Sequence, residues 1–395
     1  MEDISTVLVT LREAIEPTND MELINAFYQL EDMYDRKLWY QLTELLSTSI
    51  YSNDNSKSIR LKLFENFILN FYNKINQLKL VEFQLLSLED VELTEALDHL
   101  ISLKALIDDK LKKNDDDESI DSDGVLIFVD SEIAKTKLKL GLYDEAIAIV
   151  DEVTEKIENF HHKLDNKIYS SYYSTKMEVM KFKKNYNSYY YNSLLYLACI
   201  QDLATLPNKS LIIQDICINA VLGDKIYNFG EILMNPIFQY LKQDYLKALL
   251  VSLNEGDLKG FNSALNAHSQ DLYSLGITNL DSLREKFCIM SFIELISIHA
   301  NSSKSVKFEV VLKNIELINT AEEIESLIMK CLSLGLVKGS INQVQSRFEI
   351  SWIQPRILTK SQISKMNENL VQWSDKVNGL NKYMSDAGKE LWIAN

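Results

Sequence analysis

Apolar residues recur every three or four positions along most of this chain, which is the spacing of amphipathic helices. In the first 110 residues this pattern predicts helices over Met21–Tyr34, Leu38–Leu46 and Ile59–Leu78. Turn-forming residues are scarce, with 11 Gly and 4 Pro among 395 residues. Helices tolerate that scarcity, whereas a large all-β protein needs more turn residues. The fold class predicted is therefore mainly α.

An acidic segment interrupts the helical pattern at Lys113–Gly124. Six of its residues are acidic, and its only apolar residue is Ile120. A calcium-binding loop is the alternative, but the glycine stands at the end and no Glu stands at the twelfth position. We therefore interpret 113–124 as a solvated acidic loop.

Repeat character follows this loop. In Ala134–Val150, one helix ends at Leu140-Gly141, Tyr143 occupies the turn, and Ala146 begins the next helix. This spacing of small and aromatic residues resembles a tetratricopeptide repeat, in which two antiparallel helices pack through small residues. Weaker echoes lie at Tyr172–Tyr191 and Tyr245–His268. Because their period is irregular, we predict a degenerate TPR-like helical-repeat solenoid without a defined number of repeats.

The pattern changes after Leu280 to the element order of a winged helix. The predicted elements are a helix at Arg284–Ala300, a strand at Ser305–Phe308, a helix at Phe308–Glu316, a helix capped by Thr320 and ended by Gly335, and strands at Val337–Val344 and Arg347–Ile353. Alternation in the hairpin predicts a buried face. Its members are Val337, Ile341, Val344, Phe348, Ile350 and Trp352.

The last segment carries a heptad seam sustained over four repeats. The predicted interface residues along it are Ile363, Met366, Leu370, Trp373, Val377, Leu380, Met384 and Leu391, with Ala387 at the remaining seam position. Such a helix would be about 50 Å long. Two interpretations stay open: the seam binds partner helices, or it packs back on its own domain.

These patterns divide the chain into five predicted parts. They are N-terminal helical repeats at 1–112, the acidic loop at 113–124, TPR-like repeats at 125–280, the winged helix at 281–358, and a long C-terminal helix at 359–395.

Composition narrows the function classes. A hydrophobic content of 46% argues against global disorder, and the formal charge of −16 disfavours nucleic acid unless a local basic patch overrides it. We identify no such patch along the sequence. The N-terminus lacks a signal-peptide pattern and no run of 18 apolar residues occurs, so we expect no membrane partner.

The four cysteines are far apart and sit in apolar helical contexts. They are Cys199, Cys217, Cys288 and Cys331. We therefore expect buried reduced thiols and a location in the cytoplasm and nucleus.

Catalytic signatures are absent from the sequence. It contains no phosphate-binding glycine loop, no nucleophile elbow, and no histidine pair with metalloprotease spacing. Adjacent His161 and His162 would not face one another on a helix. We predict no catalytic residue, no cofactor and no metal, and hence no enzyme.

The predicted third helix of the winged helix is acidic. In DNA-binding winged helices this element needs Lys or Arg to meet phosphates. Here Glu322, Glu323 and Glu325 stand against Lys330 alone, and the wing offers only Lys338 and Arg347. We therefore expect a protein-docking module and no nucleic-acid partner.

Several segments carry a family resemblance. Helical repeats leading through Leu253–Phe261 into a winged helix resemble the PCI domain, which the proteasome lid, the signalosome and a translation initiation factor complex share. Leu222–Ile237, Ser333–Leu358 and Tyr186–Leu197 resemble the non-ATPase subunit 9 type of the 26S proteasome regulatory-particle lid.

This resemblance implies a non-catalytic scaffold subunit that supports lid assembly and ubiquitin-dependent protein degradation. It implies a hetero-oligomer with the other PCI and MPN subunits of the lid, and a C-terminal helix that joins a bundle. A PCI scaffold of the signalosome or of the initiation factor complex is the alternative.

Overall fold

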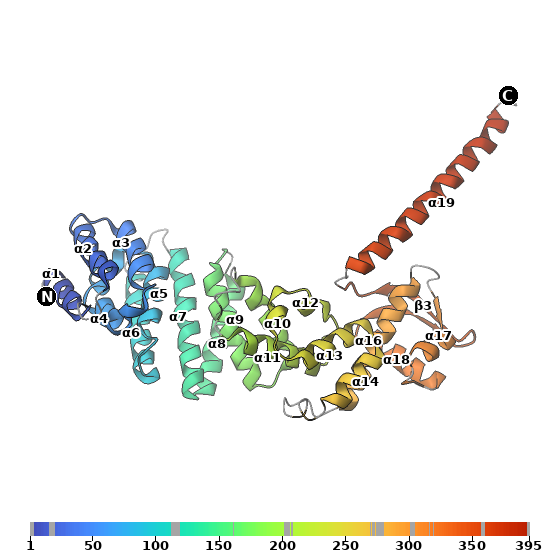
Figure 1. Ribbon diagram of the computed structural model, residues 1–395, viewed down its shortest axis with the longest axis horizontal. Helices are drawn as coiled ribbons and strands as arrows, with labels where there is room; N and C mark the ends of the chain where they lie inside the picture. Colours follow the sequence, from blue (N-terminus) through green and yellow to red (C-terminus); the bar gives the residue numbers. More distant parts are fainter. Residues whose placement is uncertain are drawn as a thin grey trace. The chain divides into compact units, whose positions relative to one another are not determined.

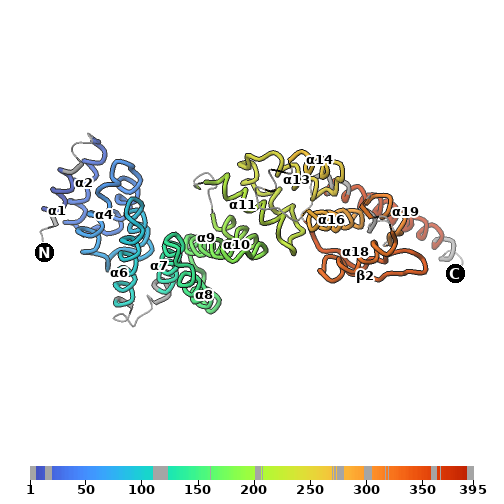
Figure 2. Tube along the Cα trace, turned by 90° about the horizontal axis from the view of Figure 1, so that it is seen from below, coloured from blue at the N-terminus to red at the C-terminus, as the bar shows by residue number. Residues whose placement is uncertain are grey.

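The computed structural model describes residues 4–15, 20–111, 119–160, 162–200, 206, 208–268, 270, 273, 280–300, 305–315, 317–318, 320–356 and 360–392. The chain divides into two compact units, Met1–Thr205 and Leu206–Asn395. Figures 1 and 2 show both units as successive helices, and Figure 1 draws strands in the second unit.

The described secondary-structure elements of unit 1 are all helical. Its α-helices are α1 Ile4–Ile15, α2 Met21–Asp35, α3 Trp39–Leu45, α4 Lys57–Asn66, α5 Gln77–Ser87, α6 Leu93–Leu111, α7 Ser119–Leu140, α8 Tyr143–Asn159, α9 Asn166–Phe182 and α10 Tyr186–Cys199. A π-turn η2 at Leu46–Ile50 and 3₁₀ turns η3 Asp54–Ser56 and η4 Ile68–Lys74 connect the early helices. One buried core extends from Val7 on α1 to Tyr172 on α9, which spans the predicted boundary near residue 112.

The single helix predicted over Ile59–Leu78 is wrong, because the chain bends twice within it. Phe71 has non-helical dihedrals (φ −129°, ψ 23°), and Asn76 caps the start of α5 by accepting from the Leu78 amide. The rings of Phe67 and Phe71 pack against Tyr34 at centroid distances of 5.5 and 5.7 Å. A straight helix buries one apolar stripe. The segment Ile59–Leu78 instead buries residues in three successive elements, α4, η4 and the start of α5, which a single straight helix would not do.

The predicted helix pair around Gly141 is confirmed. Gly141 has φ +83° and ends α7, and α8 starts two residues later. Ala134 on α7 and Ala146 on α8 are both fully buried in a small cluster that includes Val179 on α9. Small residues let neighbouring helix backbones approach closely, so the three helices lie side by side (Figure 1).

The acidic segment differs from the prediction. The loop predicted over 113–124 is wrong for residues 119–124, because α7 begins at Ser119. Acidic residues are favoured near helix N-termini, where backbone N–H groups carry partial positive charge, so acidity alone did not exclude a helix. The remainder, 113–118, lies outside the described residues.

Unit 2 carries the last helical pairs and the winged helix. Its elements are α11 Lys209–Leu222, α12 Gly230–Leu233, the 3₁₀ turn η6 Pro236–Tyr240, α13 Asp244–Glu255, α14 Leu258–Ala267, α16 Leu280–Ala300, β1 Ser305–Lys307, α17 Phe308–Asn314, α18 Ala321–Ser333, β2 Val337–Asn342, β3 Arg347–Ile353 and α19 Lys360–Trp392. The apolar helix α16 contacts α13 on one side and the winged-helix elements on the other. It therefore joins the repeats of this unit to the sheet.

The winged helix has the predicted element order. Its three antiparallel strands run in the order β1-β3-β2. Thr320 forms a capping box with Glu323 at the start of α18, and Gly335 follows the helix with φ +71°. In the part of the chain that the structure describes, these are the only strands, so the prediction of one small sheet is confirmed.

Two members of the predicted buried hairpin face are exposed. Phe348 is 1% exposed, but Val344 is 97% and Trp352 is 40% exposed. Val344 lies beyond the end of β2, in the turn. A register shift between Lys338 and Gly339 interrupts the alternation, so that Trp352 pairs with Lys338 and its ring lies 5.1 Å from the Lys338 ammonium nitrogen.

Candidate docking surface

The C-terminal helix α19 presents the predicted seam to solvent. Seven seam side chains are between 43% and 66% exposed. They are Ile363, Met366, Leu370, Trp373, Val377, Leu380 and Met384. Leu391 lies in α19, but its side chain is outside the described residues. Within unit 2, these seven side chains remain exposed.

Length and spacing explain why these residues share one stripe. α19 has 33 residues, and positions three and four apart meet on one face of a helix. Tyr383, at 72% exposure, flanks the stripe one residue before Met384, and the sequence analysis did not include it. A continuous exposed apolar stripe on a long helix is typical of a protein interaction site.

Two basic groups of the winged helix form ion pairs within unit 2. Lys330 of α18 forms an ion pair with Glu285 of α16. Arg347 of β3 lies 3.1 Å from Glu349 on the same strand. With three glutamates and one ion-paired lysine, α18 itself offers no basic face for a phosphate backbone.

A buried lysine fastens the segment that follows α11. Lys286 on α16 is 6% exposed, and its ammonium group donates to the carbonyl oxygens of Ala220 and Gly223 at 2.7 and 2.6 Å. The same nitrogen lies 5.7 and 5.2 Å from the ring centroids of Tyr227 and Phe229. These contacts fix the first part of Leu222–Ile237, one of the segments that carried the family resemblance.

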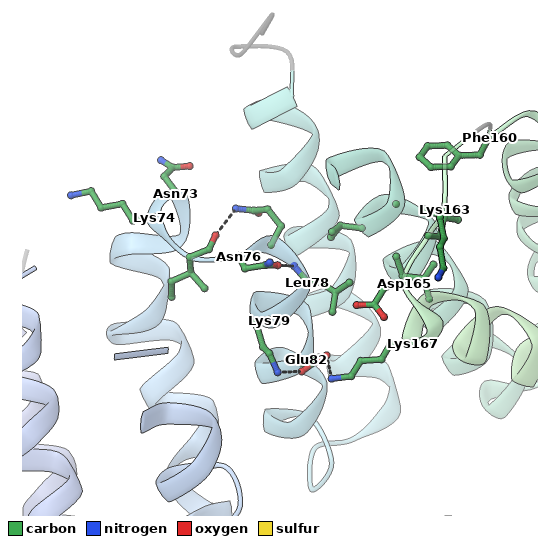
Figure 3. A pocket seen from close by; sticks show the side chains of 16 residues that line it. Asn73, Lys74, Asn76, Leu78, Lys79, Glu82, Phe160, Lys163, Asp165 and Lys167 are labelled. Atoms are coloured by element: carbon green, nitrogen blue, oxygen red, sulfur yellow. Dashed lines mark hydrogen bonds and ion pairs between the residues drawn. The ribbon is translucent and has the colours of Figure 1, made fainter. Parts of the chain in front are cut away.

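Unit 1 contains a polar recess of 510 Å³ between the start of α5 and the segment that leads into α9. Figure 3 shows Lys79 and Lys167 converging on Glu82, whose carboxylate accepts from their ammonium groups at 2.9 and 2.5 Å. The described residues that line it include no histidine, cysteine, serine or threonine. The recess therefore provides a lysine–glutamate–lysine bridge between α5 and α9, without a nucleophile–base pair.

Metal-binding and thiol groups give no further site in the described chain. Among the residues that the structure describes, no three His, Cys, Asp or Glu side chains are placed to hold a metal ion. His161 lies outside them. Cys217, Cys288 and Cys331 are buried free thiols, as predicted, whereas Cys199 is only half-buried. Burial raises the pKa of Cys217 and of Cys331 to about 12, which keeps both protonated at neutral pH.

A basic cluster on unit 1 was missed in the sequence. Lys137 and Lys139 lie at the end of α7, before the turn to α8. Lys181, Lys183 and Lys184 lie at the end of α9 and in the turn to α10. No single window of sequence is strongly basic, because the two groups are about forty residues apart. The contact between Tyr143 and Phe182 brings them together.

Across the helices that the structure describes, none has the combination of length and apolarity required to cross a bilayer.

Comparison with protein families gives three adjacent matches. PSD13 N-terminal repeats match residues 26–253, the PCI domain matches residues 258–352, and the Rpn9 C-terminal helix matches residues 356–388. The three matches correspond to the helical repeats, to the winged helix together with the helices α14 and α16 that precede it, and to α19.

Full-length relatives agree with these matches. The chain is 38% identical to the 26S proteasome regulatory subunit RPN9 of Saccharomyces cerevisiae, over 99% of both chains. It is 31% identical to the probable 26S proteasome regulatory subunit rpn9 of Schizosaccharomyces pombe, over 94% of both. It is 30% identical to the 26S proteasome non-ATPase regulatory subunit 13 of Dictyostelium discoideum, over 90% of this chain and 91% of that one.

Proposed function

Because this chain belongs to the Rpn9 family of 26S proteasome regulatory subunits, we propose that it is a non-catalytic structural scaffold of the regulatory-particle lid. In this role it supports lid assembly and thereby ubiquitin-dependent protein degradation. The chain matches proteasome subunits over nearly its whole length. This match disfavours the alternative that it is a subunit of the signalosome or of the initiation factor complex.

The observation that carries this proposal is the exposed seam of α19. Seven large or β-branched apolar side chains lie along one helix and are uncovered in the isolated chain. Burial of apolar surface contributes about 25 cal/mol per Å², so covering this stripe with partner helices strongly favours association. We infer that α19 enters a helix bundle with neighbouring subunits and that the seam residues, including Leu391, form its buried face.

The winged helix provides a second contact in this proposal. Its sheet has β1 and β2 as edges, and an edge strand offers unpaired backbone groups to another chain. We propose that it docks against neighbouring PCI subunits, and that MPN subunits of the lid are further partners. The assembly would then be a hetero-oligomer located in the cytoplasm and nucleus.

Removal of α19 tests the proposal. A tagged chain without residues 360–395 should keep the circular dichroism of a folded helical protein but fail to co-purify with the other lid subunits. The full-length tagged chain is the control. Normal co-purification of the folded truncation would overturn the assigned role of α19. Recovery of the full-length chain with signalosome or initiation factor subunits would overturn the assignment to the lid.

A further inference from the structure

Two neighbouring turns of unit 1 meet through an aromatic stack. Tyr143 opens α8 and Phe182 ends α9, and their rings stack with centroids 4.1 Å apart and planes 7° from parallel. Gly141 and Lys184 have positive φ values of 83° and 54°, which reverse the chain immediately beside these rings. The α7–α8 turn and the α9–α10 turn are therefore held together by aromatic contact.

Apolar side chains remain exposed around this stack. Four of them are between 37% and 51% exposed: Leu142, Tyr143, Phe182 and Tyr186. Stacking covers one face of each ring, and part of the area of all four residues still faces solvent. Apolar residues that gather at adjacent turns, rather than singly, are typical of a binding surface.

Five lysines lie close to these residues in the sequence and are near the same two turns. Lys137 and Lys139 precede the first turn, and Lys181, Lys183 and Lys184 flank the second. Burial raises the pKa of Glu178 on α9 above its ordinary value. The ammonium groups of Lys135 and Lys139 on α7 and of Lys181 on α9 act to lower this pKa, whereas the carboxylate of Glu132 acts to raise it. Lysines of both helices thus act on the same region of space.

Acidic residues only partly offset this charge. The two segments counted are residues 137–145 and 178–184. In them, Glu145 accepts from the Lys137 ammonium group at 2.8 Å, and Asp144 and Glu178 are the other acidic residues. Five lysines therefore stand against three carboxylates, within a chain whose formal charge is −16. A local excess of positive charge on an acidic protein selects for an anionic partner.

We propose that this surface, the Tyr143–Phe182 patch, docks an acidic peptide segment of a partner protein through an aromatic or aliphatic anchor residue. The patch comprises Leu142, Tyr143, Phe182 and Tyr186 with Lys137, Lys139, Lys181, Lys183 and Lys184. The peptide's carboxylates meet the lysines, and its anchor lies on the exposed apolar side chains.

A short acidic peptide fits the patch better than nucleic acid does. Charges are screened over about 8–10 Å at moderate ionic strength, so a short segment experiences mainly the local lysines. A long polyanion would also extend over the acidic remainder of the chain.

The anchor and the charges make different contributions. A buried apolar anchor usually carries most of the binding energy, whereas peripheral charges mainly affect association and its salt dependence. Loss of the ring pair should therefore weaken binding more than loss of one lysine. Higher ionic strength should weaken binding through the lysines alone.

Fluorescence anisotropy with the full-length chain tests the proposal. The probe is a short labelled peptide of alternating Asp and Glu with a central Phe-Leu pair, compared with an Asn/Gln version of the same peptide. We expect binding of the acidic probe, weaker binding at high ionic strength, and about tenfold weaker binding of the neutral version. The variant Lys139→Glu with Lys183→Glu should weaken binding by at least about tenfold.

Matched variants make the result decisive. Exposed Lys242 and Lys313 on unit 2 provide the control pair, and their change to Glu should leave binding unchanged. The variant Tyr143→Ala with Phe182→Ala tests the anchor surface, with circular dichroism as its folding control. If the Tyr143→Ala with Phe182→Ala variant unfolds, the variant Lys139→Glu with Lys183→Glu still tests whether the patch binds the peptide.

Three outcomes would overturn the proposal. They are equal loss of binding in the patch and control lysine variants, no binding of the acidic probe to the wild-type chain, and tighter binding of a labelled DNA duplex than of the peptide. The variant Trp373→Ala with Leu380→Ala should bind the peptide like wild type, so this test is independent of the role assigned to α19.

Discussion

The ammonium nitrogen of Lys286 lies 2.6 Å from the carbonyl oxygen of Gly223, the residue that ends α11. The last carbonyl groups of a helix lack partners within the helix and carry partial negative charge. Lys286 satisfies them from α16, together with the carbonyls of Ala220 and Val221 at 2.7 and 3.2 Å. A single side chain thus fastens the end of one helix to the middle of another.

Lys286→Met should destabilise the protein by about 2–4 kcal/mol, because methionine keeps the apolar stem but leaves buried carbonyl groups without a donor. Urea denaturation followed by circular dichroism measures the change. Lys259→Met, at an exposed position on α14, is the control and should change stability by less than about 0.5 kcal/mol. Equal stability of both variants would show that the contact of Lys286 with α11 contributes nothing.

The same lysine predicts a dependence of stability on pH. Burial lowers the pKa of Lys286 from 10.5 to about 7, although the carboxylate of Asp224 acts in the opposite direction. Between these two pKa values the unfolded chain retains a proton that the folded chain has released. The contribution of Lys286 to the free energy of unfolding is therefore lowest below about pH 7 and rises as pH increases toward about 10.5.

Paired denaturation of wild type and Lys286→Met between about pH 6 and pH 9 isolates this contribution. The difference in unfolding free energy, wild type minus variant, should increase with pH. Cys331 and Tyr227 lie nearby and their pKa values are raised to about 12, but they are present in both proteins, so their titration cancels. A difference that stays flat or falls with pH would contradict the prediction.

The variant Trp373→Ala with Leu380→Ala should reduce co-purification with lid subunits by about tenfold or more, because buried aromatic and aliphatic anchors carry most interface energy. Charge reversal at Lys376 and Lys382 on the same helix is the matched control and should have little effect, since exposed ion pairs contribute about 0–1 kcal/mol. Quantitative mass spectrometry of the purified assemblies measures both. A stronger effect of the charge reversal would refute the apolar seam as the docking element.

Replacing glycine by alanine should have opposite effects on stability at Gly339 and at Gly379. A Cβ on Gly339 would lie 2.2 Å from the carbonyl oxygen of Glu349, whereas a Cβ on Gly379 would meet no atom within 4 Å. Gly339→Ala should therefore destabilise the winged helix by about 1–3 kcal/mol, because β2 must move away from β3. Gly379→Ala should favour α19 by about 1 kcal/mol through helix propensity alone.

Thermal denaturation and helical circular dichroism compare the two glycine variants. A lower melting temperature is expected for Gly339→Ala, and an equal or higher helical signal for Gly379→Ala. If both variants melt like wild type, the close approach of β2 and β3 at Gly339 is not a constraint on the sheet.

Local sequence signals were sufficient for much of unit 2. The capping box of Thr320 and Glu323 and the left-handed Gly335 define the ends of α18 through contacts within a few residues. The period of α19 likewise depends only on its own side chains. Such features are predictable because helix geometry fixes which neighbouring positions share a face.

Packing between distant segments decided where this reasoning failed. Phe67 and Phe71 fit the apolar stripe of one straight helix. In the structure both rings pack against the distant ring of Tyr34, and the backbone is kinked at Phe71. Trp352 fits a buried alternation, but the register shift opposite it turns it outward. In both cases the residue pattern allowed two structures, and contacts absent from the local sequence selected one.

The sequence alone thus determined the helical class, the winged-helix order, the family resemblance and the position of the seam, since each depends on periodicity or on residues close together in the chain. Only the tertiary structure determined that the seam is exposed, that Lys286 caps a helix 63 residues before it, and that the lysine-bearing turns after α7 and α9 meet at the Tyr143–Phe182 stack. These features depend on which distant segments pack together, because side-chain burial and charge clustering are properties of the folded surface rather than of any window of sequence.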